Sequence, residues 1–299
     1  MTSSFKALMI GIRPPTLLVG LTPILIGLAF GFKELAGTYT SLEIAMAIGA
    51  IIFVLLMQSG ANLVNDVKDA DSGVDSSREG PMRVVTAGLL SKEQVKFAYK
   101  VCFGISFVLI SIFTAKVGIL LFILGILGIA SAYFYTSGPR PLAYYALGEL
   151  IALLFFGPIA VAGTAMLLIG DWDNDIALWG LGPGFFAASL MAVNNYRDRI
   201  SDAKAGKKTL ANILPEPVAV KLPLVFQLTA LGILCSYSFE MGLGSQLTIP
   251  ILLLLFFVVF LISPRIKPDS AVISLVSALK LTAALTFLYG LVFTATVLL

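Results

Sequence analysis

Acidic and amide side chains recur at helical spacing at the end of a long apolar run. Asn62, Asp66 and Asp69 stand at positions i, i+4 and i+7 in the segment NLVNDVKDADSGVDSSREGPMR, which we name the first patch (Asn62–Arg83). If the apolar helix before them continues, all three side chains share one helical face. Carboxylates that close repel one another, and the usual remedies are a bound cation, a basic partner or a raised pKa. Hard divalent ions such as Mg²⁺ prefer oxygen ligands of this kind.

A second segment, NNYRDRISDAKAGKKTLA, repeats this arrangement after another apolar run, and we name it the second patch (Asn194–Ala211). Asn194, Asp198 and Asp202 stand at i, i+4 and i+8, again on one helical face. A charged segment between membrane helices is ordinarily a solvated surface without chemistry of its own. Three features argue against that reading here. The carboxylates fall at helical spacing against the apolar run, amides accompany them, and the arrangement occurs twice.

Basic side chains accompany both patches, with Arg78 and Arg83 in the first and Lys207 and Lys208 in the second. Two carboxylate clusters holding Mg²⁺ beside such cations suit a diphosphate, whose oxygens need metal bridging and neutralisation. An apolar cavity behind the site favours a prenyl diphosphate, with its tail among the helices. When the diphosphate departs, the protein must keep water from the allylic cation, and an electron-rich aromatic acceptor attacks such a cation without a strong base.

The composition decides which medium surrounds these patches. The 299 residues are 58% hydrophobic and only 12% charged, and the mean hydropathy is +0.97, whereas soluble domains are about one quarter charged. The chain is therefore a polytopic membrane protein. It contains no histidine, which excludes imidazole bases, zinc sites with His ligands and His-ligated haem. Cys102 and Cys235 both lie in apolar runs and give neither a disulfide framework nor metal-ligand spacing.

Apolar runs predict nine transmembrane helices around a central cavity, in one transmembrane domain over residues 1–299. Most runs approach the ~20 residues that a helix needs to cross the hydrocarbon core, and period-2 alternation typical of a membrane barrel is missing. We treat the first run as a retained helix, because it lacks a small-residue cleavage site. The expected spans are 14–32, 43–62, 97–114, 117–135, 142–169, 176–196, 222–239, 247–263 and 271–298.

The basic residues predict how the chain is oriented in the cell membrane. All but three of the 20 Lys and Arg residues fall in the N-terminal segment and in or beside the segments that follow the second, fourth, sixth and eighth spans. The opposite side carries Lys33 and Lys116, and Lys280 lies inside the last span. By the positive-inside rule, the N-terminus and both patches are cytoplasmic and the C-terminus faces outward. Two carboxylate faces therefore reach the same membrane surface.

Both patches resemble the two aspartate-rich motifs of the UbiA superfamily of intramembrane prenyltransferases, and the resemblance extends over essentially the whole chain. That superfamily has nine helices and a Mg²⁺-diphosphate site between the two motifs. The resemblance implies Mg²⁺ as cofactor, a polyprenyl diphosphate and an aromatic acceptor as substrates, membrane lipids as surroundings, and no nucleic acid partner. It assigns Mg²⁺ binding to Asn62, Asp66, Asp69, Asp198 and Asp202. The four aspartates of this group are also the predicted catalytic residues.

The same resemblance implies further substrate contacts. Asn65 and Asn194 would assist the metal ligands, Asp75 is a lesser candidate, and Lys208 is interpreted as solvated. Diphosphate oxygens would be contacted by Arg78, Arg83 and Lys207. Arg140 is assigned to substrate binding within the segment YTSGPRPLAYYALGE (Tyr135–Glu149).

One branch of the superfamily is favoured by details of spacing. The pattern NDxxDxxxGxD, with Gly73 and Asp75, followed by GPMR (Gly80–Arg83), resembles the enzymes that prenylate 1,4-dihydroxy-2-naphthoate in menaquinone synthesis. The segments Tyr135–Glu149 and GKKTLA (Gly206–Ala211) are also similar to that branch. In it, the ring carbon that bears the carboxylate attacks the prenyl cation and carbon dioxide is lost, which gives a demethylmenaquinol.

Two charged side chains inside spans are costly enough to need a function. At 1.5 Å per residue, Glu149 and Lys280 both lie roughly 10–14 Å from the cytoplasmic end. We hypothesise that they pair with each other or help to place the aromatic acid, the alternatives being a structural ion pair or a snorkelling lysine. A cluster of tyrosines near the same face could line the acceptor pocket or anchor the chain at the interface: Tyr133, Tyr135, Tyr144 and Tyr145.

Other functions stay open at this stage. Within the superfamily the acceptor could be another quinone precursor, a chlorin, haem or a glycerol phosphate lipid. A cation-coupled transporter belongs to a different class, and it predicts carboxylates near the bilayer midplane and interrupted helices. The acidic clusters of this chain end cytoplasmic helices instead. A purely structural membrane subunit would leave both patches without a purpose.

Overall fold

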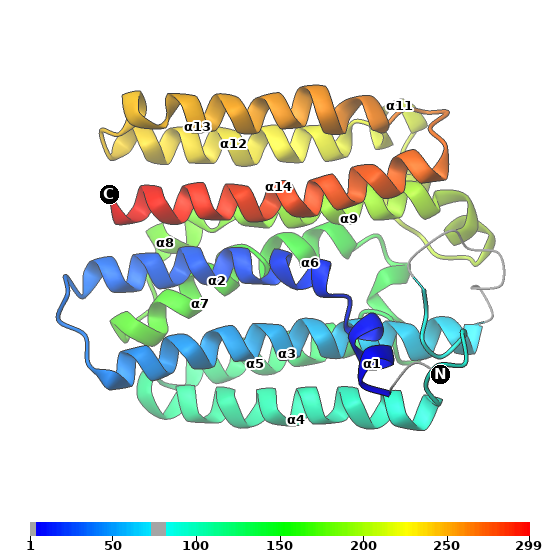
Figure 1. Ribbon diagram of the computed structural model, residues 1–299, viewed down its shortest axis with the longest axis horizontal. Coiled ribbons are helices and arrows are strands. Elements are labelled where there is room, and N and C mark those ends of the chain that lie inside the picture. The colour runs from blue at the N-terminus through cyan, green and yellow to red at the C-terminus, as the bar shows by residue number, and fades with distance from the viewer. Residues whose placement is uncertain (1–3, 73–81) are drawn as a thin grey trace.

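Long helices lie side by side along the long axis of the molecule (Figure 1). The computed structural model describes residues 4–72 and 82–299. The helices of this part of the chain are α1 (Ser4–Ile12), α2 (Pro14–Glu34), α3 (Ser41–Ser72), α4 (Lys92–Val117), α5 (Ile119–Phe134), α6 (Gly148–Phe155), α7 (Pro158–Ile169), α8 (Asn174–Trp179), α9 (Leu181–Lys204), α10 (Leu210–Ile213), α11 (Glu216–Ala219), α12 (Leu222–Glu240), α13 (Gly244–Phe256), which a π-helical turn continues over Phe257–Ile262, and α14 (Val272–Leu298).

The predicted all-helical membrane architecture is confirmed. Among the described residues, eight helical segments are long and apolar enough to cross a membrane, and Ile119–Phe134 is a shorter apolar helix. Each of the nine predicted spans corresponds to one of these segments, so the count of nine holds when the short α5 is included. The N-terminal and C-terminal ends lie at opposite ends of the bundle (Figure 1), as an odd number of crossings requires.

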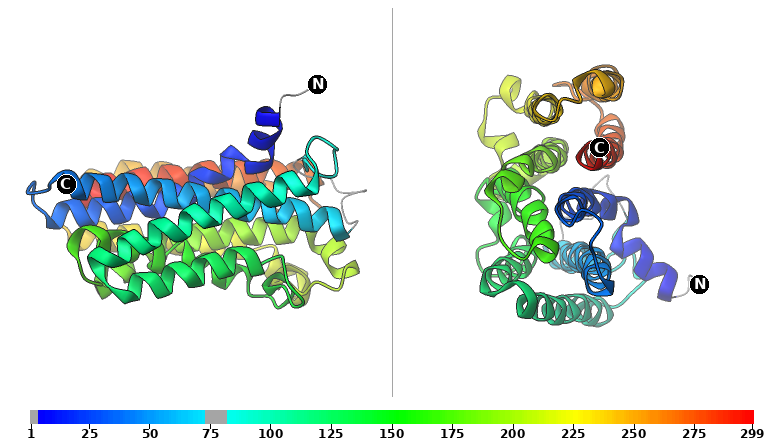
Figure 2. Two further views of the ribbon diagram at one scale, coloured as in Figure 1. Left: turned by 90° about the horizontal axis from the view of Figure 1, so that it is seen from below. Right: turned by 90° about the vertical axis from the view of Figure 1, so that its left-hand side faces the viewer.

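Packing within the bundle is dense on the side formed by α2, α9, α12 and α14. An aromatic cluster fills the space between these helices, and its members include Phe186 and Tyr289, whose ring centroids lie 4.6 Å apart. Seen end-on, α12 and α13 stand at one extreme of the bundle and α4 at the other, while α1 projects away from it (Figure 2). The carboxylate-bearing ends of α3 and α9 both lie between these extremes.

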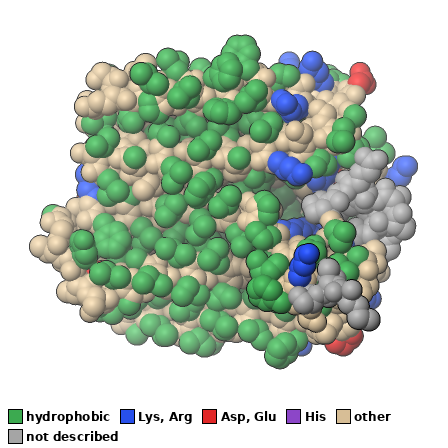
Figure 3. Space-filling model, viewed as in Figure 1, with side chains coloured by type: hydrophobic (Ala, Val, Ile, Leu, Met, Phe, Trp, Pro, Cys, Tyr) green, Lys and Arg blue, Asp and Glu red, His purple; other side chains and the backbone are tan. Residues whose placement is uncertain are grey.

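Both patches continue their apolar helices. The helix α3 runs to Ser72 and α9 to Lys204, so both extend beyond the expected span ends at 62 and 196. The condition for placing Asn62, Asp66 and Asp69 on one face is thereby met. The two helix ends lie at the same end of the bundle (Figure 1). Lys and Arg side chains gather at that end, where the surface is also hollowed (Figure 3).

Two of the expected spans are interrupted helices rather than single ones. The span expected over 142–169 divides into α6 and α7 at Phe156–Gly157, and the span over 176–196 divides at Gly180. The breaks meet: a Cβ on Gly157 would lie 2.8 Å from the Gly180 carbonyl oxygen and 2.9 Å from Gly184 Cα. A side chain on any of these glycines would separate the helices, so we name this crossing the glycine contact (Gly157, Gly180 and Gly184).

The start of the span expected at 142 is also different. A 3₁₀ turn over Leu142–Tyr144 precedes α6, and Ala146 adopts a positive φ of 54°. The Ala146 amide donates a hydrogen bond of 2.9 Å to the carbonyl oxygen of Lys208. This hydrogen bond joins the segment before α6 to the second patch, and the positive φ of Ala146 is incompatible with an α-helix at that point.

Candidate active site

Asp66 is the most deeply buried carboxylate of the first patch, with 0% of its surface exposed. One carboxylate oxygen accepts a hydrogen bond of 2.9 Å from the amide of Val84, and the other accepts one of 2.9 Å from the amide of Val85. Each carboxylate oxygen can accept a second interaction. These two hydrogen bonds hold the segment that follows the first patch against α3.

The Asn62 side chain on α3 forms hydrogen bonds with the N-terminal segment. Its side-chain amide donates hydrogen bonds to the Ile12 carbonyl oxygen at 2.7 Å and to Thr16 Oγ1 at 2.9 Å. The junction between α1 and α2 is therefore fixed against α3. Since both amide protons are used, the carbonyl oxygen is the atom by which Asn62 can act as a ligand.

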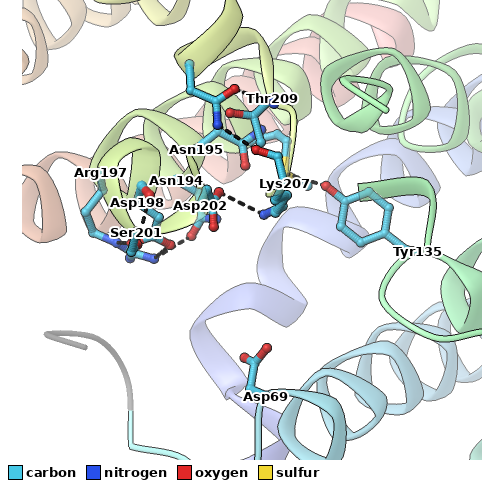
Figure 4. A network of polar contacts seen from close by, with 12 residues as sticks. Asp69, Tyr135, Asn194, Asn195, Arg197, Asp198, Ser201, Asp202, Lys207 and Thr209 are labelled. Atoms are coloured by element: carbon cyan, nitrogen blue, oxygen red, sulfur yellow. Dashed lines mark hydrogen bonds and ion pairs between the residues drawn. The ribbon is translucent and has the colours of Figure 1, made fainter. Parts of the chain in front are cut away.

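Asp69 forms an ion pair with Arg83, and the exposed fractions of their side chains are 23% and 11%. The Asp69 side chain points from α3 toward the second patch in Figure 4. Asn65 is half-buried on the same helix. Three other predicted residues, Gly73, Asp75 and Arg78, lie outside the described residues.

The second patch contains a buried ion pair that the sequence analysis missed. The Arg197 guanidinium and the Asp198 carboxylate form a bidentate ion pair. Nε donates a hydrogen bond to Oδ1 at 2.8 Å, and Nη2 donates one to Oδ2 at 2.7 Å. Nη2 also donates to Asn194 Oδ1 at 2.9 Å. Only 3% of the Arg197 side chain and 5% of the Asp198 side chain are exposed. The sequence signal for this pair was that Arg197 directly precedes Asp198. Adjacent side chains on a helix usually point in different directions, so the adjacency did not predict a contact.

Asp202 is paired with a lysine from the turn that follows α9. Lys207 Nζ lies 2.9 Å from Asp202 Oδ2, and the Lys207 amide donates to the Asp202 carbonyl oxygen at 2.9 Å. The side-chain Nδ2 of Asn212 in turn donates to the Lys207 carbonyl oxygen at 2.7 Å. Lys207 is half-buried and Lys208 is exposed; the assignment of Lys207 to the diphosphate stays a prediction.

Glu149 at the start of α6 lies against α9 and is 3% exposed. Its Oε1 accepts a hydrogen bond of 2.9 Å from Asn195 Nδ2. Within the described part of the chain, Glu149 Oε2 and Asn195 Oδ1 are both buried without a hydrogen-bond partner. Two acceptor oxygens without donors inside a membrane helix pair are costly. Their positions indicate a place where a ligand supplies the donors.

Tyr135 approaches the same spot from the end of α5. Its hydroxyl lies 3.3 Å from Met191 Sδ (Figure 4), and a Cβ on Gly148 would lie 2.7 Å from it. A tyrosine hydroxyl is protonated at neutral pH and can donate a hydrogen bond here. We name Tyr135, Glu149 and Asn195 the inner polar cluster. Tyr144 and Tyr145 are 38% and 52% exposed, as expected for interfacial residues.

The hypothesis that Glu149 pairs with Lys280 is wrong. Lys280 is exposed on α14, whereas Glu149 is buried and bound to Asn195. A common depth in the membrane does not bring together residues of different helices. Arg140 is exposed as well, in the turn between α5 and α6.

Three of the five predicted metal ligands form ion pairs in the structure. Among residues 4–72 and 82–299, no group of three or more Asp, Glu or Cys side chains is close enough to hold a metal ion. Asp69, Asp198 and Asp202 instead each contact a basic side chain. The donor set consists of carboxylate and amide oxygens, which fits Mg²⁺ in its chemistry. A common ligand set would form by exchange of these basic partners.

Comparison with known proteins agrees with this arrangement. The family described as the UbiA prenyltransferase family matches residues 20–278. A 1,4-dihydroxy-2-naphthoate octaprenyltransferase of Haemophilus influenzae is 34% identical over 211 residues, which cover 67% of this chain and 66% of that protein. The enzyme of the same name from Escherichia coli is 32% identical over 221 residues, with coverages of 72% and 70%. The alignments thus span about two thirds of each relative.

Solved structures share the fold. A UbiA homolog from Aeropyrum pernix K1 superposes with a TM-score of 0.69 at 16% identity, covering 92% of this chain and 96% of that one. A UbiA homolog from Archaeoglobus fulgidus bound to GPP and Mg²⁺ gives a TM-score of 0.65 at 19% identity, with coverages of 97% and 99%. The family match over most of the chain, the fold and the two carboxylate-bearing helix ends lead to one conclusion. This chain belongs to the UbiA prenyltransferase family.

Proposed function

We propose that this chain transfers a polyprenyl group from a polyprenyl diphosphate to 1,4-dihydroxy-2-naphthoate, releasing diphosphate and carbon dioxide and giving a demethylmenaquinol. The observation that carries the proposal is the placement of two carboxylate-bearing helix ends, those of α3 and α9, at one end of an apolar bundle. The names of the relatives in Haemophilus influenzae and Escherichia coli support this acceptor.

Arg83 and Lys207 would contact the diphosphate, together with Arg78. Both of the described cations now neutralise carboxylates, Asp69 and Asp202. When a diphosphate binds together with a metal ion, the cations and the carboxylates could each exchange partners. The cations would then bind phosphate oxygens, and the carboxylates would bind the metal ion. Every charge is then paired both before and after binding. This arrangement avoids an isolated charge in a poorly solvated site.

The residues that would hold Mg²⁺ are those of the two patches, with Asn65 and Asn194 assisting: Asn62, Asp66, Asp69, Asp198 and Asp202. When bound, Mg²⁺ would neutralise the diphosphate and so favour its departure. The fit of the donor set supports the metal, since every proposed ligand atom is an oxygen. A related fold bound to GPP and Mg²⁺ supports it as well.

The proposed reaction balances without a histidine. The allylic C–O bond breaks and diphosphate leaves with the electron pair, while the ring carbon bearing the carboxylate forms the new C–C bond. The bond to the carboxylate then breaks, carbon dioxide departs, and its electron pair restores the aromatic ring. The ionised acceptor and the prenyl cation thus give the products without net proton loss. The chain has to orient the acceptor and exclude water from the cation.

The inner polar cluster is the part of the structure that we assign to the acceptor. Glu149 Oε2 and Asn195 Oδ1 are buried acceptors that lack donors in the described chain, and dihydroxynaphthoate carries two hydroxyl donors. Tyr135 adds a protonated hydroxyl beside them. Arg140 and Lys280 remain assigned to substrate binding as exposed cations, without a contact to Glu149.

We place the N-terminus and both patches on the cytoplasmic side of the membrane and the C-terminus outside. The gathering of basic side chains at the patch end supports this orientation (Figure 3). So do the positions of the two chain ends at opposite ends of the bundle.

The experiment supplies dihydroxynaphthoate, a polyprenyl diphosphate and Mg²⁺ to the purified chain and identifies products by mass spectrometry. We expect a prenylated product that has lost the carboxylate. A product that retains it would contradict the decarboxylative route. Turnover of another quinone precursor, with none of dihydroxynaphthoate, would refute the proposed acceptor.

A further inference from the structure

A cavity of about 140 Å³ lies on the face of α3 that points away from the active site. Val64, Lys68 and Asp71 line it from α3, at positions i, i+4 and i+7. This face is on the opposite side of the helix from Asn62 and Asp66, because two residues correspond to about 200° of helical rotation. The cavity therefore lies on a different face of α3 from the predicted metal ligands Asn62 and Asp66, although its α3 residues belong to the first patch.

Polar side chains from three segments line this cavity. Lys96 and Tyr99 come from α4, and Tyr133 and Ser137 come from the end of α5 and the turn after it. The ring centroids of Tyr99 and Tyr133 lie 6.2 Å apart. Ser137 is 1% exposed, and within the described residues its hydroxyl is buried without a hydrogen-bond partner. A buried hydroxyl that lines a cavity and lacks a partner indicates a missing polar ligand.

The charge of the cavity favours an anion. Lys68 and Lys96 are half-buried, and in the described part of the chain neither forms an ion pair. Asp71, the one acidic residue among the described residues of the lining, is already paired with Lys92. Two lysines, a serine hydroxyl and two tyrosines supply donors of the kind that phosphate oxygens accept.

The neighbouring surface favours a lipid as the source of that anion. Phe97 follows Lys96 and is 71% exposed, and Phe134 follows Tyr133 and is 48% exposed. Exposed aromatic side chains beside lysines suit the boundary between headgroups and acyl chains. Basic pockets between transmembrane helices on the cytoplasmic side bind anionic headgroups. A lipid would place its phosphate among the lysines and its chains along the two phenylalanines.

We propose that this cavity, lined by Lys68, Lys96, Tyr99, Tyr133 and Ser137, binds the phosphate headgroup of an anionic membrane phospholipid. The site holds together α3, α4 and the turn after α5. These are the elements that carry Asp69 and Tyr135, so an occupied site stabilises the frame of the active site from behind. Binding is independent of the proposed reaction, and its test needs no substrate.

The test measures thermal unfolding of the purified full chain in detergent with added phosphatidylglycerol, phosphatidylcholine or inorganic phosphate. We expect phosphatidylglycerol to raise the midpoint, whereas phosphatidylcholine and phosphate at equal concentration do not. The variant Lys68→Gln/Lys96→Gln should weaken the apparent affinity by roughly 30-fold, because each lysine near an anionic lipid contributes roughly fivefold. Lys221→Gln/Lys267→Gln is the matched control. It removes the same charge from exposed positions at the same end of the molecule, and should bind as the unaltered chain does.

A charge-neutral variant separates the built site from general attraction to a charged surface. Ser137→Ala should weaken phosphatidylglycerol binding by roughly two- to tenfold through loss of one hydrogen bond, and native mass spectrometry should count fewer retained lipids. The proposal is overturned if the double lysine variant responds to phosphatidylglycerol as the control does. It is equally overturned if inorganic phosphate reproduces the shift, since the site would then be an anion site without a lipid.

Discussion

Replacing Glu149 by glutamine tests whether the inner polar cluster selects the acceptor. Glu149 is 3% exposed and is held through Oε1 by the Asn195 amide. The glutamine carbonyl can keep that bond, so its NH₂ group takes the place of Oε2. A hydroxyl group of the acceptor that donated to a carboxylate oxygen now meets a second donor. The variant therefore removes the hydrogen bond between the acceptor hydroxyl and Oε2 and preserves the shape of the site.

The size of the effect follows from the kind of bond that is lost. A hydrogen bond to a charged group contributes about 1.5–3 kcal/mol, which corresponds to roughly 10- to 150-fold in kcat/KM for dihydroxynaphthoate. The KM for the polyprenyl diphosphate should not change, because we assign that substrate to the carboxylates and cations of the two patches rather than to Glu149. Thermal stability should stay equal or rise, since a buried amide is less costly than a buried carboxylate.

The assay compares dihydroxynaphthoate with 1-hydroxy-2-naphthoate, which lacks one hydroxyl, as acceptors for the unaltered chain and for Glu149→Gln. The unaltered chain should discriminate against the analogue, and the variant should lose most of that discrimination. Glu43→Gln is the control, because Glu43 lies at the other end of α3, where it pairs with Lys116. Equal discrimination by Glu149→Gln and the unaltered chain would refute the assignment. If the unaltered chain is inactive with both acceptors, that result would instead refute the proposed function.

The remaining predictions concern the two patches. Asp66→Ala should abolish turnover and lower the free energy of unfolding by about 2–4 kcal/mol, because two backbone amides lose a buried charged acceptor; thermal unfolding and turnover measure this. Asp69→Ala should also abolish turnover but change stability by less than about 1 kcal/mol, since its ion pair with Arg83 is partly exposed, and retained activity would contradict its place among the ligands. Arg197→Gln should destabilise the chain by about 3–5 kcal/mol, because it removes the cationic partner from one side of a buried ion pair, and an unchanged thermal unfolding midpoint would contradict this. Removing divalent ions with EDTA should stop turnover and added Mg²⁺ should restore it, whereas full activity in EDTA would exclude Mg²⁺ dependence.

The sequence was sufficient for the helices and for the faces that carry the carboxylates. An apolar run of about 20 residues predicts a helix, because a segment that crosses the bilayer must form its backbone hydrogen bonds internally. The spacing of Asn62, Asp66 and Asp69 reports a shared face because the helix has a fixed period. Both properties are local. The structure extends α3 and α9 through their patches, as this spacing required.

The partners of the charged groups could not be predicted in the same way. Arg197 forms an ion pair with the adjacent Asp198, and Glu149 accepts a hydrogen bond from Asn195 rather than pairing with Lys280. These choices depend on how α6 and α9 pack, which no local pattern reports. The break at Gly157 did have a signal in the dipeptide Gly157–Pro158, but a wide hydropathy window averages over it.

If the inner polar cluster binds the acceptor as proposed, the glycine contact would let residues remote from the substrate influence acceptor selection. Gly157 lies about two turns from Glu149 along the interrupted span, and Gly184 lies about three turns from Asn195 along α9. A Cβ on Gly184 would lie 2.4 Å from the Leu153 carbonyl oxygen, so alanine there must push the two helices apart. Displacement of catalytic groups by about 1 Å can lower a rate by roughly 100-fold. Variants with altered acceptor preference should therefore arise at these buried glycines as well as at residues that touch the acceptor.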